Sequence, residues 1–176
     1  MGLPLVVSDY RNKKILKRFK VTPVSPAMIL AVQVVIYTIY SIVSLVLLYV
    51  VSALFFGLHL LGSLSAFLGG YMLVMLSIFS IGMMVGGISP NSQTASVIAS
   101  LLYFPMLIFS EVTLPYEVMP STLQKIADVL PLTQGIKLLK AASLGLPIEN
   151  VFVPVIVMAV LAVICIGVSL RFFRWE

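Results

Sequence analysis

The residue types that could do chemistry gather in one basic segment near the start of the chain. In "DYRNKKILKRFKVTPVSP", residues 9–26, six of the eleven Lys and Arg side chains occupy ten consecutive positions, directly before a long apolar run. Cations at this density bind acidic groups, either on a protein or on lipid headgroups. The six are Arg11, Lys13, Lys14, Lys17, Arg18 and Lys20. Which of the two surfaces they bind depends on the elements around them.

Elsewhere the sequence holds no set of residues for covalent, acid–base or metal chemistry. The apolar runs contain neither paired carboxylates nor the spacing of metal ligands. Cys165 is the single cysteine, which excludes a disulfide framework or a cysteine metal site. The glycine-rich phosphate-binding loop is missing too, because no Gly-Lys pair occurs. We therefore expect no catalytic residue, metal or cofactor in this chain, and a membrane-embedded enzyme is disfavoured.

The composition indicates an integral membrane protein. Apolar residues make up 61% and charged residues 10% of the chain, and the mean hydropathy is +1.16. Because a spanning helix needs about 20 apolar residues, four stretches qualify: 27–56, 64–88, 94–112 and 151–170. We expect an all-α membrane protein with four full transmembrane helices in a single membrane domain, residues 1–176. The first stretch is about ten residues too long and should tilt or project.

The span from Glu111 to Asn150 differs from these four stretches. It is interrupted by prolines and glycines and carries scattered charges, so it cannot form one spanning helix. Within it one helical face is apolar and the opposite face is polar. The apolar face holds Leu123, Ile126, Ala127 and Leu130, and the polar face holds Gln124, Lys125 and Asp128. This pattern predicts a short interfacial helix, and we expect short extracellular helices over 113–145.

The distribution of cations predicts the orientation. Eight of the eleven cations lie at the two ends of the chain, and the other three, between 111 and 150, are offset by four acids. Lys and Arg accumulate in cytoplasmic segments. Four crossings place both termini on one side, so we expect both to be cytoplasmic, in the plasma membrane. The net charge of +5 thus reflects topology, and we expect no nucleic-acid partner.

The basic segment itself is predicted to form an amphipathic helix. Asn12, Ile15, Leu16 and Phe19 share one face at 100° per residue, and the cations occupy the rest. Ser8 or Asp9 is a candidate cap, and the prolines of "TPVSP" stop the helix. Such a helix either lies on anionic headgroups or docks a cytoplasmic protein. Periodicity alone favours the headgroups.

Two patterns inside the apolar runs have structural and functional interpretations. A polar stripe lies within roughly 80° of one face of the first run and either lines a translocation path or supplies hydrogen bonds between helices. Its members are Gln33, Tyr37, Tyr40, Ser41 and Ser44. Gly82 and Gly86 form a G-x-x-x-G motif, which permits close approach of another helix.

The order of the motifs resembles the membrane subunit of type-2 ATP-binding-cassette exporters. "RNKKILKRFKVTPVSPAMIL", a long helix, "FPMLIFSEVTLPYEVMPSTLQKIADVLPLT" and a last helix follow one another over nearly the whole chain. One specific motif is the basic helix that ends at Thr22-Pro23-x-Ser25-Pro26. The other is the run from Ser110 through Pro115 to Pro120, followed by Leu130-Pro131.

This resemblance implies roles for both motifs. In the family the basic segment, here residues 9–20, is the cytoplasmic coupling helix that rests on the ATPase subunit. The residues implied in ATPase coupling are Arg11, Lys14, Ile15, Lys17, Arg18 and Phe19. The proline-rich segment is a pair of re-entrant helices that cap the substrate path, which makes Ser110, Glu111, Pro115 and Pro120 an extracellular gate motif.

The chain departs from the family pattern in two places. Family members usually have six spanning helices, whereas this chain has four and an apolar stub, residues 1–8, that resembles the end of the second. The first helix and most of the second are expected to be missing. The family also favours a small residue after the serine, where Glu111 stands here; we interpret Glu111 as a surface acid at the outer interface.

The resemblance implies an exporter subunit that moves an amphipathic, drug-like or lipid-like substrate out of the cytoplasm. A separate ATPase would bind ATP and Mg, and the chain would pair in the bilayer with a second membrane subunit, expected to be a copy of itself. The alternative is a truncated or accessory membrane protein without transport activity.

Overall fold

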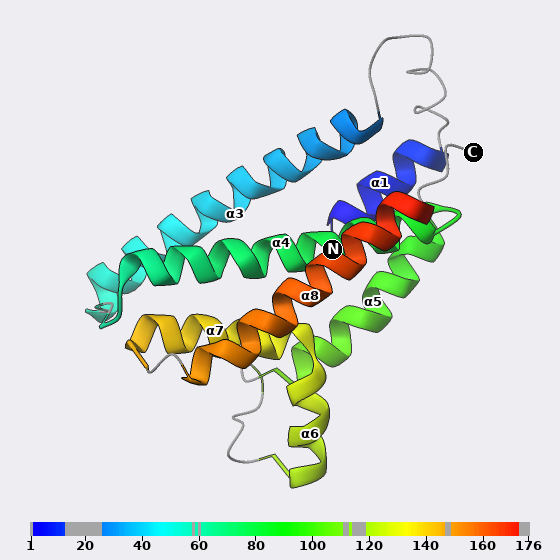
Figure 1. Cartoon of the computed structure of the whole chain (residues 1–176). Coiled ribbons are helices and arrows are strands. Elements are labelled where there is room, and N and C mark those ends of the chain that lie inside the picture. The colour runs from blue at the N-terminus through cyan, green and yellow to red at the C-terminus, as the bar shows by residue number, and fades with distance from the viewer. Residues whose placement is uncertain are drawn as a thin grey trace.

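A computed structural model of the chain describes residues 2–12, 26–57, 59, 61–110, 113, 119–146 and 149–172. Every regular element in these ranges is a helix, and Figure 1 shows their arrangement. The helices are α1 (Gly2–Asn12), α3 (Pro26–Phe56), α4 (Leu64–Ile88), α5 (Ser92–Ile108), α6 (Ser121–Val129), α7 (Pro131–Leu144) and α8 (Glu149–Phe172). The expected all-α fold is confirmed for the described residues.

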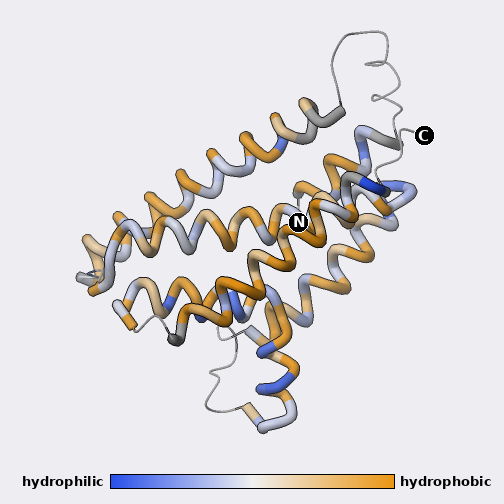
Figure 2. The backbone as a smooth tube through the Cα atoms, in the orientation of Figure 1, coloured by the Kyte–Doolittle hydropathy of each residue, from blue (hydrophilic) through white to orange (hydrophobic). Residues whose placement is uncertain are grey.

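Three of these helices are long and apolar enough to cross a membrane. The candidate spans are Ala31–Phe56, Leu64–Ile88 and Val151–Ser169, with mean hydropathies of 2.4, 2.0 and 3.1. Figure 2 shows their predominantly hydrophobic colouring, in contrast to the hydrophilic stretches on α6 and α7. Together with the composition, these helices identify an integral membrane protein. The fourth apolar helix, α5, is shorter.

Helix α5 ends earlier than the sequence predicts. We expected a span to Val112, but the helix stops at Ile108, and Phe109 has φ −90° and ψ 4°. Pro105 lacks a backbone donor, and the hydroxyls of Ser110 and Thr113 both donate to the carbonyl of Leu107 at 2.8 Å. These two side-chain hydrogen bonds occupy the Leu107 carbonyl, which would accept a backbone hydrogen bond if the helix continued. At 17 residues α5 is about 25 Å long, shorter than a hydrocarbon core of roughly 30 Å. A full fourth crossing therefore stays a prediction.

Helix α4 is the centre of the bundle. It packs against α8, α1, α7 and α5, whereas α3 diverges from the other helices (Figure 1). In the most apolar part of α3 no residue is buried. A helix that is apolar on all sides and uncovered by protein requires lipid or another subunit around it. At 31 residues it is about 46 Å long, consistent with the expected excess over one bilayer crossing.

The connections gather at two ends of the bundle. Asn12 of α1, the turn between α4 and α5 and the last turn of α8 lie at one end (Figure 1). At the other end, the backbone N–H groups of Leu61 and Gly62 donate to the carbonyl of Ser143 at 3.1 and 2.9 Å. This ties the α3–α4 turn to the last turn of α7. Gly62 leaves no room for a Cβ there, because the Ala142 carbonyl occupies that space.

Helix α1 crosses a boundary that the sequence analysis placed between residues 8 and 9. We expected Ser8 or Asp9 to begin a new helix, but α1 continues through both. Ser8 is fully buried and its hydroxyl has no hydrogen-bond partner among the described residues. The cap prediction is wrong because Leu3 and Val7, also buried, continue one apolar face into this turn and seat it on α4.

Candidate functional site

The predicted coupling segment lies largely outside the described residues. Lys14, Ile15, Lys17, Arg18 and Phe19 fall in the gap between α1 and α3, and only the backbone of Arg11 is described, in α1. The assignment of this segment to a partner ATPase thus stays a prediction. What the structure does describe is the helix that leads into it.

The G-x-x-x-G motif of α4 forms the seat for α1. A Cβ at Gly86 would lie 2.9 Å from the carbonyl oxygen of Pro4 and 2.9 Å from the Cβ of Val7. At Gly82 the nearest atoms, from Leu3 and Pro4, are 3.4 Å away. The two glycines therefore bring the backbones of α1 and α4 into direct contact, as small residues do between membrane helices.

An apolar cavity of about 200 Å³ opens beside this contact. Its walls come from five helices and are made by apolar and aromatic side chains, among them the tyrosines Tyr37 of α3 and Tyr103 of α5. The residues that line it include Leu3, Tyr37, Phe79, Leu102, Met106 and Leu132. Because α3 diverges on one side, the cavity suits an apolar group that enters from the membrane.

The structure separates the members of the predicted polar stripe on α3. Tyr37 reaches the cavity, and its ring lies 6.5 Å from that of Tyr40 and 6.2 Å from that of Phe79 in edge-to-face geometry. The Ser41 hydroxyl is 2.5 Å from the hydroxyl of Tyr71 on α4, which also donates to the Ser41 carbonyl at 2.9 Å. Tyr40 and Ser44 are exposed, and Gln33 is half-buried. Only Tyr37 lines the cavity, whereas Ser41 hydrogen-bonds two helices together.

The predicted gate motif is only partly described. Ser110 is fully buried and ends α5 through its bond to Leu107. The carbonyl of Pro120 accepts from the N–H groups of Leu123 and Gln124 at 2.9 and 3.1 Å, which begins α6. Glu111 and Pro115 lie outside the described residues. Both described members of the motif delimit helices, and their role as a gate stays a prediction.

Sequence reasoning missed two polar clusters. Ser77 on α4 is fully buried and donates to the carbonyl of Met158 on α8 at 2.9 Å, which links the two most closely packed helices. Ser80, one turn later, is also buried. The available signal was a pair of serines at i and i+3 in an apolar helix, a spacing that places both on one face.

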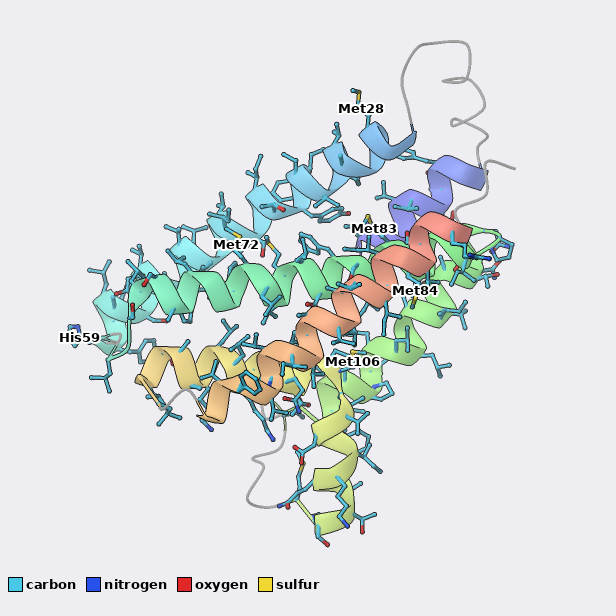
Figure 3. All side chains as sticks on the ribbon, in the orientation of Figure 1. Met28, His59, Met72, Met83, Met84 and Met106 are labelled. Atoms are coloured by element: carbon cyan, nitrogen blue, oxygen red, sulfur yellow. The ribbon has the colours of Figure 1, made fainter. Side chains whose placement is uncertain are left out.

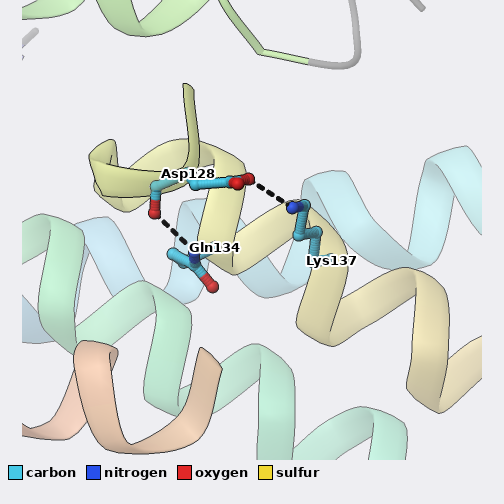
Figure 4. Close-up of polar contacts among 3 residues, drawn as sticks. All are labelled: Asp128, Gln134 and Lys137. Atoms are coloured by element: carbon cyan, nitrogen blue, oxygen red, sulfur yellow. Dashed lines mark hydrogen bonds and ion pairs between the residues drawn. The ribbon is translucent and has the colours of Figure 1, made fainter. Parts of the chain in front are cut away.

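The second missed cluster joins α6 to α7. The Lys137 ammonium lies 2.6 Å from an Asp128 carboxylate oxygen, and the Gln134 amide donates to the Asp128 carbonyl at 2.6 Å (Figure 4). The chain turns at Leu130, which has extended geometry, and Pro131 begins α7. This break folds α7 back beneath Asp128. The sequence signal was Leu130-Pro131 itself, because the residue before a proline avoids helical geometry.

The lone histidine is remote from the cavity. Figure 3 shows His59 at the α3–α4 turn, at one end of the molecule and away from Met83 and Met106. No group of His, Cys, Asp or Glu suited to a metal ion occurs among the described residues.

A family comparison adds the decisive observation. The family model described as "ABC-2 type transporter" matches residues 3–144, which include α1, the seat on α4, the cavity and α7. The chain belongs to the ABC-2 type transporter family. As a member of this family it is a transporter membrane component, which agrees with the resemblance drawn from its motifs.

One curated relative supports this assignment at lower coverage. Nodulation protein J of Neorhizobium galegae is 31% identical over 98 residues, which are 56% of this chain and 35% of that protein. The match thus spans about a third of the length of the relative. No solved structure matches the chain.

Proposed function

We propose that this ABC-2 type transporter chain is the membrane subunit of an exporter that moves an amphipathic substrate out of the cytoplasm. The observation that supports this most strongly is the apolar cavity lined by α1, α3, α4, α5 and α7, in the region that matches the family. A wall that is mainly apolar and includes two tyrosines, Tyr37 and Tyr103, suits a drug-like or lipid-like molecule with a small polar group.

In this proposal a separate ATPase drives the movement. The chain carries no Gly-Lys pair for a phosphate-binding loop, so ATP and Mg are bound by the partner. The basic segment after Asp9 receives the push from the ATPase, and α1 passes it to α4 through Gly82 and Gly86. A second membrane subunit, expected to be a copy of this chain, covers the exposed helices. Both termini face the cytoplasm.

The first prediction tests the partner. We expect the tagged full chain, expressed with its ATP-binding-cassette ATPase subunit, to purify as a complex that hydrolyses ATP, while the chain alone gives only background hydrolysis. The matched control is a mock purification from cells that lack the chain. Hydrolysis by the isolated chain well above that control would contradict the proposal. An isolated chain that inserts but never joins an ATPase would favour the accessory alternative.

A further inference from the structure

Helix α3 contributes one side chain to the apolar cavity. Among the described residues, Tyr37 is the single lining residue that comes from this helix. The other walls come from α1, α4, α5 and α7, which pack against one another. The α3 side of the cavity is therefore covered by one aromatic ring, whereas the other sides are built from packed helices.

The Tyr37 side chain reaches from α3 to two other helices. Its ring meets the ring of Phe79 on α4 in edge-to-face geometry, with 6.2 Å between the ring centroids. Its hydroxyl occupies the space beside Gly2 of α1, where an added Cβ would lie. Tyr37 thus fills the space between α1, α3 and α4 at the edge of the cavity.

Hydrogen bonds tie α3 to α4 one helical turn away from Tyr37. The Tyr71 hydroxyl donates to the Ser41 carbonyl at 2.9 Å, so in the contact of 2.5 Å between the two hydroxyls Ser41 is the donor. From this level the two helices run close together toward the α3–α4 turn and part toward Pro26 (Figure 1). The Ser41–Tyr71 bonds therefore mark the point at which α3 leaves the bundle.

These features allow α3 to move while the rest of the bundle stays packed. No residue in the most apolar part of α3 is buried, so little packing opposes a movement of this helix. A hydrogen bond between membrane helices contributes only a small stabilisation. A rotation of α3 about Ser41 would separate Tyr37 from Phe79 and leave the contact between α1 and α4 intact.

We propose that α3 is a lateral gate through which substrate enters the cavity from the bilayer. The Ser41–Tyr71 bonds are the hinge, and Tyr37 is the side chain that closes the gate. This inference rests on the proposed function, because it names the entry route of the proposed substrate. The substrate is then an amphiphile already dissolved in the membrane, and its apolar part enters past Tyr37. The second membrane subunit covers exposed helices other than α3.

The second prediction tests this gate by fluorescence quenching in the full chain. Phe79→Trp places a tryptophan behind Tyr37, in a Trp175→Phe background that removes the native fluorophore. The lipid of the nanodisc is phosphatidylcholine with brominated acyl chains, which quench a tryptophan that they contact. Ser41→Ala should raise the ratio of open to closed gate about threefold, which corresponds to roughly 0.6 kcal/mol for one bond. Tyr71→Phe should raise it further, because it removes both bonds.

Two further variants separate the gate from a general loosening of α3. Thr38→Val is the matched control, because the Thr38 hydroxyl donates to the Val34 carbonyl within α3 at 2.7 Å. It should leave quenching at the level of the parent protein. Tyr37→Ala removes the closing ring but not the hinge, so it should increase quenching while the Ser41–Tyr71 bonds remain.

Either of two results would overturn the gate. Equal quenching in Tyr71→Phe and Thr38→Val would mean that the bonds between α3 and α4 do not hold the cavity closed. Unchanged quenching in Tyr37→Ala would mean that protein, and not lipid, covers the α3 side. Neither measurement needs an ATPase or transport. A gate that opens to lipid in a chain that moves no dye would therefore contradict the proposed function alone.

Discussion

Gly86 lies at the closest approach between the helix that precedes the basic segment and the helix at the centre of the bundle. The absence of a side chain there is what allows the Pro4 carbonyl and the Val7 side chain to touch α4. The sequence predicted that the G-x-x-x-G motif permits close helix packing. It did not predict which helix packs there, because the motif creates room for a neighbour without specifying the neighbour.

The third prediction concerns this glycine. Gly86→Ala should lower the free energy of unfolding by about 1–3 kcal/mol, because an added methyl overpacks a contact of 2.9 Å to backbone. Gly69→Ala is the matched control on the same helix, since nothing lies within 4 Å of its Cβ position. Unfolding in mixed detergent micelles measures both. Equal stability of the two variants would mean that α1 does not pack on α4 as described.

The polar stripe on α3 predicted a shared helix face but not the role of each side chain on it. Tyr37, Tyr40 and Ser41 share a face by periodicity, but only Tyr37 lines the cavity, and Ser41 meets Tyr71 instead. Which of these roles each side chain takes depends on where α3 diverges from α4, and helical spacing contains no information about that angle. The ion pair between Asp128 and Lys137 was missed for a similar reason, since it depends on the fold-back at Leu130.

At the scale of elements, length and apolarity predicted α3, α4 and α8 within one or two residues at each end. Those helices are continuous apolar runs, and the bilayer selects for such runs directly. The boundaries that failed, at Ser8 and at Ile108, depend on local hydrogen bonds and on tertiary packing. Ser8 is held inside a longer helix by contacts of Leu3 and Val7, which no local signal indicates.

The fourth prediction belongs to the basic element between α1 and α3. Lys14→Glu with Arg18→Glu should leave membrane insertion intact, because the apolar spans are unchanged and six of the eight terminal cations remain. Co-purification of the ATPase should fall by at least tenfold, since like charges placed at an interface cost several kcal/mol. Quantitative immunoblotting of the purified complex, at matched membrane abundance, measures the loss.

A scrambled segment provides the matched control for that charge reversal. It keeps all six cations but displaces Ile15, Leu16 and Phe19, so it preserves attraction to anionic headgroups and removes the apolar face. If the segment couples to an ATPase, the scramble should uncouple it as strongly as the reversal does. If the scrambled variant binds the ATPase normally, the segment acts as an anchor on lipid headgroups and not as a coupling helix.

At the scale of the whole molecule, the chain combines a tightly packed pair, α4 and α8, with a diverging α3 and a cavity lined by α1, α3, α4, α5 and α7. The end that holds Asn12 and the α4–α5 turn leads to the basic segment, and the opposite end holds the fold-back of α6 and α7 (Figure 1). In the mechanism that we propose, a push at the first end would reach the cavity through α1 and α4, as alternating access requires.

The fifth prediction tests the central claim, that this chain exports an amphiphile when an ATPase drives it. The measurement is uptake of fluorescent amphiphilic dyes into inside-out membrane vesicles that contain the full chain and its ATPase at matched abundance. We predict uptake that requires ATP and both proteins, and that a hydrolysis-deficient ATPase abolishes. ATP-dependent uptake of the same size in vesicles without the chain, or no uptake of any dye by a complex that hydrolyses ATP, would contradict the account.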